Sequence, residues 1–417
     1  MTQVAAIAPQ FARKTAKARQ LTLARYHLVR RLASLYLATK TVKDRVFAWP
    51  PYREERDREG IDSLLANARH YLKGLDATLE FFLETGDGVV RCSSHPPYDR
   101  VVRQEKIGAE AAKRSLCRAR FCTVWRLDGM RWGSSYRPYL YNIERGVGRY
   151  DANEWLRLTT DLYLASHEFP AHQAPLPAHP VNSCAVLGTG PSYEQFLNEA
   201  DRYDAWIGAN SVACDERVRQ LGRPFAICML DPHILSPLDS MLPTLEGVFA
   251  LLRETPAVLI TIRDFAAFIE LNFPADLKRK CHYLPALGHD GISFGLADDL
   301  NRLMVTPYGN VLTDLMLPVA ASISRKVVVY GCDGKKPGSE GFFDKGGVVS
   351  KVDDKQNEQL ANVIDHSTYD YYVQMHNIFT RYVVDQCLGK GVDISVRRPS
   401  WNAGLQHLTV GTLCSDD

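Results

Sequence analysis

The sequence predicts an α/β protein whose C-terminal half forms a doubly wound, mostly parallel sheet, and two observations predict it. From residue 182 onward, short apolar runs alternate with segments of helical periodicity. This alternation is typical of a parallel sheet covered by helices on both faces. Small or polar residues follow most of the runs, as at the ligand-binding edge of such sheets. The expected strands are 184–187, 205–207, 225–230, 258–262, 327–330 and 394–396, and the expected helices are 193–200, 212–221, 238–253, 310–324 and 368–388.

The composition is that of a globular protein with a core, since 46% of the 417 residues are hydrophobic and 24% are charged. It excludes a disordered, collagen-like or coiled-coil chain. No run approaches the roughly 18 unbroken apolar residues of a membrane span. Arg13 and Lys14 follow the short apolar opening directly, which is not the pattern of a secretory signal. We therefore expect a cytoplasmic protein, with its ten cysteines reduced because no Cys-x-x-Cys pair occurs.

The N-terminus carries a basic amphipathic helix, expected over residues 10–45. Nine lysines and arginines precede Asp44, and no acidic residue does. Because the net charge of the whole chain is +2, the rest of the chain has a net charge of +2 − 9 = −7. Leu21, Leu28, Leu32 and Leu35 are spaced for one helix face. Two interpretations stay open: a helix in peripheral contact with the anionic inner membrane, or a solvated helix that caps the second domain.

The pattern predicts two domains. Residues 1–165 form a mainly helical N-terminal domain, with an apolar helical stripe over 54–83. Short alternating runs within 117–145 suggest strands around Gly129 and Gly133. A proline-rich linker follows at 166–181, and residues 182–410 form the doubly wound domain.

Five turns with small or polar residues follow the expected strands or begin a helix. They are 188–192 (Gly-Thr-Gly-Pro-Ser), 208–211 (Gly-Ala-Asn-Ser), 231–233 (Asp-Pro-His), 306–310 (Thr-Pro-Tyr-Gly-Asn) and 331–336 (Gly-Cys-Asp-Gly-Lys-Lys). Glycine lets a ligand approach the backbone closely, and a helix N-terminus offers N–H groups to a phosphate. The first turn is neither a P-loop nor a complete dinucleotide fingerprint. Each turn alone is explained equally well as a β-turn or helix cap, but five in succession favour a binding site.

The order of these motifs resembles the bacterial sialyltransferase family 42. It is also similar to the related region of flagellin-modifying nonulosonic-acid transferases and of pterin diphosphokinase-like proteins. In the sialyltransferases the first motif reads Gly-Asn-Gly-Pro-Ser, the second ends in asparagine, and a histidine follows the Gly-x-Asp strand after a lid. The resemblance covers about residues 182–405 and implies a Rossmann-like fold, as a GT-A-like variant.

The resemblance implies an inverting glycosyltransferase that uses a CMP-linked sugar acid. The donor sugar would be a sialic, legionaminic or pseudaminic acid, or Kdo, and the acceptor a hydroxyl of a surface glycan or glycolipid. No metal and no nucleic acid would take part. His366 matches the family's catalytic base, and imidazole can take a proton near neutral pH. The positions that match the nucleotide-sugar site are Gly188, Thr189, Gly190, Pro191, Ser192, Asn210, Asp231, Gly309, Asn310, Asp333, Lys335 and Lys336.

Three departures from the family pattern stand out. Thr189 replaces an asparagine, and Asp231 replaces another asparagine before proline. The family's leaving-group tyrosines are absent after the Gly-x-Asp motif, where Lys335 and Lys336 stand instead. These lysines would either stabilise the departing CMP or face water from a mobile lid over 335–362.

Two alternatives remain open. One is a diphosphokinase-like transferase that uses ATP and Mg²⁺, with Asp231 and Asp333 as metal ligands, since Mg²⁺ prefers oxygen ligands near phosphate. The other is a nucleotide-binding protein without turnover.

Overall fold

The computed structural model describes residues 42–53, 58–86, 88–108, 111–112, 119–124, 140–142, 149–168, 174, 181–236, 239, 241–285, 310–334 and 366–411. The chain divides into two compact units. The first comprises residues 1–22, 172–263 and 274–417, and the second comprises 23–171 and 264–273.

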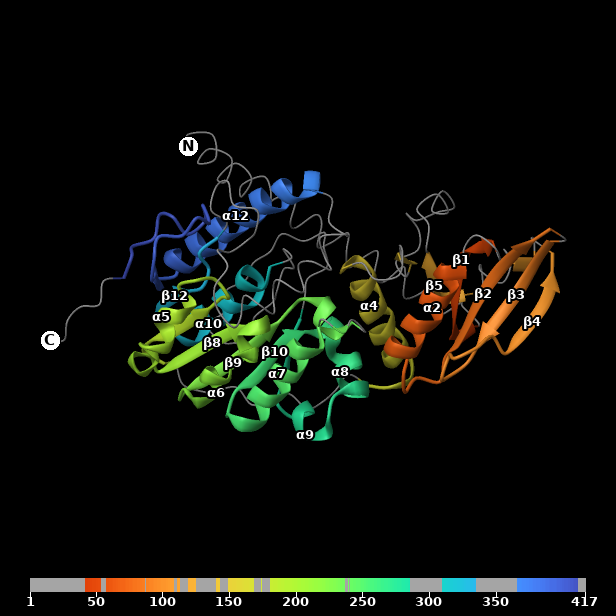
Figure 1. Cartoon of the computed structure of the whole chain (residues 1–417), viewed down its shortest axis with the longest axis horizontal. Helices are drawn as coiled ribbons and strands as arrows, with labels where there is room; N and C mark the ends of the chain where they lie inside the picture. Colours follow the sequence, from red (N-terminus) through yellow and green to blue (C-terminus); the bar gives the residue numbers. More distant parts are fainter. Residues whose placement is uncertain are drawn as a thin grey trace. The chain divides into compact units, whose positions relative to one another are not determined.

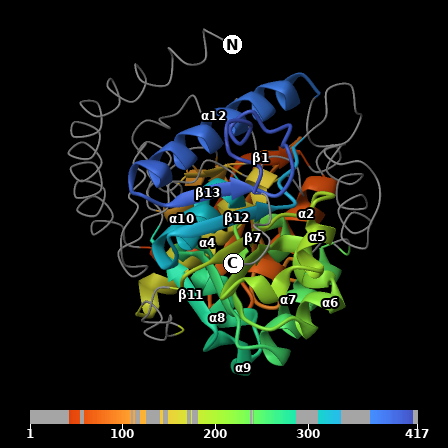
Figure 2. The ribbon, with the colours of Figure 1, turned by 90° about the vertical axis from the view of Figure 1, so that its left-hand side faces the viewer.

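The first unit contains a seven-stranded sheet of order β11-β10-β9-β8-β7-β12-β13, in which every neighbouring pair is parallel. From β7 the chain winds outward to β11, and β12 and β13 then lie on the other side of β7. Figure 1 labels β8, β9, β10 and β12 of this sheet, and Figure 2 labels β7, β11, β12 and β13. The prediction of a doubly wound, parallel sheet is therefore confirmed. The strands are β7 (Cys184–Leu187), β8 (Ala205–Ala209), β9 (Pro224–Met229), β10 (Val258–Ile262), β11 (Cys281–Leu284), β12 (Lys326–Tyr330) and β13 (Asp393–Val396).

Helices cover both faces of this sheet, as right-handed crossovers in two winding directions require. In Figure 2, α5, α6 and α7 lie on one face, whereas α10 and α12 lie on the other. The helix expected over 310–324 begins with a π-helical turn, η8, and the one expected over 212–221 divides into η4 and α6. The helical elements are α5 (Tyr193–Leu197), η3 (Ala200–Arg202), η4 (Asn210–Cys214), α6 (Glu216–Gln220), η5 (Pro232–Leu235), α7 (Leu242–Glu254), α9 (Ala275–Lys278), η8 (Leu312–Met316), α10 (Leu317–Ile323) and α12 (His366–Gly389).

An aromatic cluster connects β12 to the segment after β7. Phe196 packs edge-on against Tyr330 with ring centroids 5.5 Å apart, and Tyr203 meets Tyr330 in the same way at 5.9 Å. The hydroxyl of Tyr330 donates to Glu199, which also accepts from Arg397 at 2.7 Å. This partly buried ion pair connects the chain after β13, through Glu199, to Tyr330 of β12.

The second unit contains a six-stranded sheet of order β4-β3-β2-β1-β5-β6, with antiparallel pairs at β2–β3 and β3–β4. The strands are β1 (Val42–Arg53), β2 (Thr78–Thr85), β3 (Gly88–Ser94), β4 (Arg103–Ile107), β5 (Ala119–Val124) and β6 (Leu140–Asn142), and the helices are α2 (Arg58–Tyr71), α4 (Arg149–Ser166) and α8 (Ala266–Asn272). Tyr71 of α2 stacks on Trp155 of α4 with centroids 5.8 Å apart.

The expectation of a mainly helical N-terminal domain is wrong for the described residues, because this sheet occupies much of them. The stripe expected as one helix over 54–83 belongs to α2 and β2, which Gly74 separates with a φ of +83°. β2 lies between β1 and β3 and is buried along most of its length. A buried strand carries a continuous apolar run that periodicity alone does not separate from a helix.

Two other expectations concern parts of this unit. The end of the helix expected over 10–45 belongs to β1, and its remainder lies outside the described residues. β5 and β6 lie within 117–145, where strands were expected, but Gly129 and Gly133 are outside the described part. Among the described helices, none has both the length and the apolar character needed to cross a membrane.

Candidate functional site

The site lies at the carboxyl ends of β7 and β12, where the direction of winding reverses. β7 leads to β8 on one side, and β12 leads to β13 on the other. In doubly wound sheets the loops diverge at this switch point and leave a crevice in which ligands bind. Two predicted motifs, residues 188–192 and residues 331–334, follow these two strands directly.

The two loops touch through their backbones. The N–H of Gly190 donates to the carbonyl oxygen of Gly331 at 2.7 Å. A Cβ on Gly188 would lie 2.4 Å from that same oxygen. Gly331 has a φ of +64°, and a Cβ there would lie 2.1 Å from the carbonyl oxygen of Gly188. No side chain fits these distances, so the glycines allow the loops to meet.

Polar contacts then lock the loops together. The hydroxyl of Ser192 accepts from the N–H of Gly331 at 2.7 Å, and the N–H of Ser192 donates to Oδ2 of Asp333 at 2.9 Å. The N–H groups of Gly190 and Ser192, which were expected to face a phosphate, are therefore bonded within the protein. Asp333 acts here as an acceptor that fixes the first loop.

Asn210 and Asp231 follow the next two strands. Asn210 follows β8 as the first residue of η4, with a φ of +49° that asparagine tolerates better than most residues. Its Oδ1 is buried with no hydrogen-bond partner in the described structure. Asp231 caps η5 by accepting the N–H of His233 at 3.1 Å. Asn210 thus offers an unsatisfied buried acceptor, whereas the carboxylate of Asp231 already has a backbone partner.

Asn310 sits where η8 begins, and it contacts α12. Its Oδ1 accepts from the N–H of Leu312 at 2.8 Å, and its Nδ2 lies 2.7 Å from Nε2 of His376. Burial lowers the pKa of His376 to about 4, so the ring is neutral at physiological pH and can accept from an amide. The Nδ2 of Asn402 approaches the same Nε2 at 3.4 Å. η8 itself packs against β8 and β9.

A turn at 400–404 completes the described site, and it was not predicted from the sequence. The hydroxyl of Ser400 donates to the carbonyl oxygen of Cys332 at 2.8 Å, and the N–H of Trp401 donates to that of Asp333 at 2.6 Å. The turn follows β13, and the other loops were predicted because they follow strands of the sheet. The same criterion would therefore have predicted this turn. A Cβ on Gly334 would lie 2.4 Å from the N atom of Asn402.

Four predicted positions lie partly or wholly outside the described residues. His366 is the first residue of α12, but its side chain lies outside the described residues. Gly309, Lys335, Lys336 and the segment 335–362 also lie outside them. Within the described part of the chain, no group of three or more His, Cys, Asp or Glu side chains is placed to hold a metal ion.

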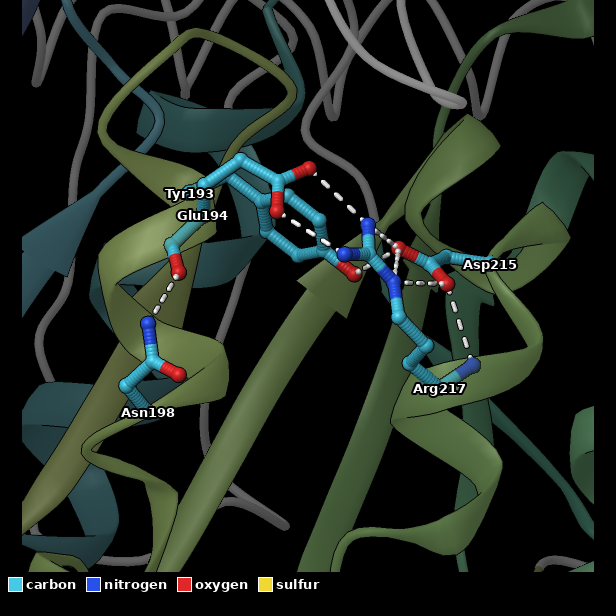
Figure 3. A network of polar contacts seen from close by, with 5 residues as sticks. All are labelled: Tyr193, Glu194, Asn198, Asp215 and Arg217. Carbon is cyan, nitrogen blue, oxygen red and sulfur yellow. Dashed lines mark hydrogen bonds and ion pairs between the residues drawn. The ribbon is translucent and has the colours of Figure 1, made fainter.

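A polar network connects the start of α5 to the start of α6 (Figure 3). The hydroxyl of Tyr193 donates to Oδ2 of Asp215 at 3.0 Å. Arg217 donates to both carboxylate oxygens of Asp215 and, at 2.9 Å, to each oxygen of Glu194. Because Tyr193 follows residues 188–192 directly, the network fixes the end of that loop against η4 and α6.

We expect Asp215→Asn to lower the free energy of unfolding at pH 7 by about 1–3 kcal/mol, because the buried Tyr193 and charged Arg217 lose an ionised acceptor. Burial by itself raises the pKa of Asp215, but hydrogen bonds from Arg217 and Tyr193 outweigh it, and the pKa is lowered. A carboxyl group whose pKa is lowered by folding stabilises the folded state at pH values above its unfolded pKa, which is near 4. This contribution is lost as the pH falls through the pKa of the folded state. Urea unfolding at several pH values should show the difference shrinking below pH 4.

The matched control is Glu194→Gln, which removes the more exposed carboxylate of the same network. Its ion pair with Arg217 is largely solvated, so we expect a loss below about 1 kcal/mol. Equal losses for the two variants would contradict the assignment of Asp215 as the central acceptor.

Fold and site together define a doubly wound α/β protein with a candidate ligand site at the switch point of its sheet. The chain matches no protein-family model, and no curated protein matches it. Among solved structures, the MAf glycosyltransferase from Magnetospirillum magneticum AMB-1 is similar at a TM-score of 0.28 and 13% identity. The match covers 55% of this chain and 45% of that one, so this chain spans less than half of the neighbour's length.

Proposed function

We propose that the protein is an inverting glycosyltransferase that transfers a nonulosonic or related 2-keto sugar acid from its CMP-linked donor. The acceptor is a hydroxyl of a surface glycan or glycolipid. The observation that carries the proposal is that residues 188–192 and 331–334 meet at the carboxyl ends of β7 and β12, the switch point of the sheet. These loops follow the strands in the motif order that resembles sialyltransferase family 42.

The described residues support different roles for different residues in donor binding. Residues 188–192 supply a backbone turn that lines the proposed nucleotide site, and its glycines allow it to pack against residues 331–334. The buried Oδ1 of Asn210 suits an N–H or O–H donor of the nucleotide or sugar, which would satisfy it. The N–H groups of Gly190 and Ser192 already donate to acceptors within the protein. We therefore propose that Lys335 and Lys336, rather than those N–H groups, neutralise the charge of the phosphate.

The proposed reaction is a single displacement. The acceptor oxygen forms a bond to the anomeric carbon as the bond from that carbon to the phosphate oxygen breaks, and CMP leaves with the bonding electrons. His366 takes the proton from the acceptor hydroxyl. Attack opposite to the leaving group inverts the anomeric centre. The lysines stabilise the negative charge that develops on CMP.

The ATP and Mg²⁺ alternative receives less support from the described carboxylates. Asp333 accepts the N–H of Ser192, and Asp231 accepts the N–H of His233. Each therefore stabilises a turn of the backbone. We retain this alternative as an outcome of the ligand experiment.

We expect CMP without added metal to raise the melting temperature of the protein. A ligand that binds only the folded state at 100 times its Kd stabilises by about 2.7 kcal/mol, or several degrees. Thermal-shift measurements with CMP, CTP and ATP, each with and without Mg²⁺, test this. Stabilisation by ATP only with Mg²⁺ would favour the diphosphokinase-like reaction and contradict the proposal, and CMP binding without sugar transfer would favour a non-catalytic protein.

We also propose that the basic N-terminus contacts the anionic inner membrane. Removal of residues 1–43 deletes nine positive charges, and each surface Lys or Arg contributes about 1 kcal/mol of attraction to an anionic leaflet. We expect the full chain to co-sediment with phosphatidylserine vesicles at low salt and the truncated chain to lose this binding while it still binds CMP. Insolubility of the truncated chain would instead indicate a helix that belongs to the core.

A further inference from the structure

Trp401 is a large apolar side chain left exposed beside the switch-point loops. It is 49% exposed, whereas Trp155 and Trp206 are buried. Aromatic side chains contribute most to binding when a ligand covers them. An exposed indole next to a candidate ligand site is therefore a candidate contact for that ligand.

The turn that carries Trp401 is fixed by its own contacts. The hydroxyl of Ser400 accepts from the N–H of Asn402 at 3.0 Å and donates to the carbonyl oxygen of Cys332. The Oδ1 of Asn402 accepts from the N–H of Gly404 at 2.8 Å. Ser400 and Asn402 are buried on either side of Trp401. The indole thus extends from a backbone that needs no ordering when a ligand binds.

This turn is joined to both ends of the candidate site. The carboxylate of Asp333 accepts the N–H of Ser192, and the carbonyl oxygen of Asp333 accepts the N–H of Trp401. Asp333 therefore connects Trp401 directly to residues 188–192. On its other side, Asn402 approaches His376, which contacts Asn310. Asn310 is one of the positions that the family resemblance assigns to the nucleotide-sugar site.

We propose that Trp401 is the stacking platform for the pyrimidine base of the CMP donor. This inference rests on the proposed function and deepens it by assigning the base-binding residue. The polar side-chain oxygens of the turn are already bonded inside the protein, so the turn offers a ligand chiefly the exposed indole. A nucleobase has the π-face that such a ring stacks on.

Calorimetric titration of the full-length protein with CMP and with ribose 5-phosphate, which lacks the base, tests the proposal. Stacking of a base on an aromatic ring is lost on substitution by alanine, so Trp401→Ala should weaken CMP binding about 5- to 150-fold. Trp401→Phe retains a ring and should recover most of this loss. Ribose 5-phosphate binding should be the same in all three proteins. Leu242→Ala, at a residue 51% exposed on α7, is the matched surface control and should bind CMP as the wild type does.

Fluorescence gives a second readout that does not depend on the alanine variant. CMP should quench part of the tryptophan emission of the wild type, and this quenching should be absent in Trp401→Phe. Unchanged CMP affinity in Trp401→Ala, or quenching that persists in Trp401→Phe, would overturn the inference and leave the proposed function intact. Failure of the wild type to bind CMP would overturn both.

Discussion

Replacement of His366 by alanine is expected to lower the rate of sugar transfer by a factor of about 10²–10⁴, which is the usual contribution of a general base. The acceptor hydroxyl is a poor nucleophile until its proton is removed, so the variant loses the step that activates it. CMP affinity should stay nearly unchanged, because the base acts on the acceptor rather than on the nucleotide. Transfer to a labelled acceptor under single-turnover conditions, together with CMP titration, separates the two effects.

The control for this experiment is His407→Ala. His407 lies 3.6 Å from Asp385 and has no part in the proposed reaction, so its removal should leave transfer unchanged. His376 is a weaker base than a free imidazole, because burial lowers its pKa to about 4, and its ring is in contact with the amide of Asn310. Near wild-type turnover in His366→Ala would remove this residue from the mechanism.

The doubly wound sheet was predictable because parallel strands buried on both faces appear in the sequence as short, uninterrupted apolar runs. β7 and β10 have the predicted bounds. β11 escaped notice because its four residues include His282 and follow the basic stretch 278–280. The polar ring of His282 is accommodated in the core at 3.3 Å from the carbonyl oxygen of Ala174, a partner more than a hundred positions away.

The positions of the site loops were predictable, but their internal bonding was not. Small residues after β7 and β12 indicated where the loops would diverge, since every strand of a parallel sheet ends at the same edge. The sequence suggested that the N–H groups of Gly190 and Ser192 face a phosphate, whereas Gly331 and Asp333 accept them. These partners lie about 140 positions downstream, so only the fold brings them together.

The glycines of these loops have a further consequence for stability. We expect Gly331→Ala to lower the free energy of unfolding by about 3–5 kcal/mol, at the upper end for a single substitution. A left-handed φ costs a non-glycine residue roughly 1–2 kcal/mol, and here the new Cβ also meets the backbone of Gly188, which has no flexible end to move away. The two loops must separate, so the CMP site should be lost along with the stability.

Gly391→Ala separates the cost of the left-handed conformation from the cost of the contact with Gly188. Gly391 has a φ of +76°, close to that of Gly331, but a Cβ there meets nothing within 4 Å. This control should lose only the roughly 1–2 kcal/mol of the left-handed conformation and keep its affinity for CMP. Urea unfolding of both variants measures the difference, which is the cost of separating the loops. Equal losses would mean that residues 188 and 331 need not touch, and the switch-point crevice would then have to be built in another way.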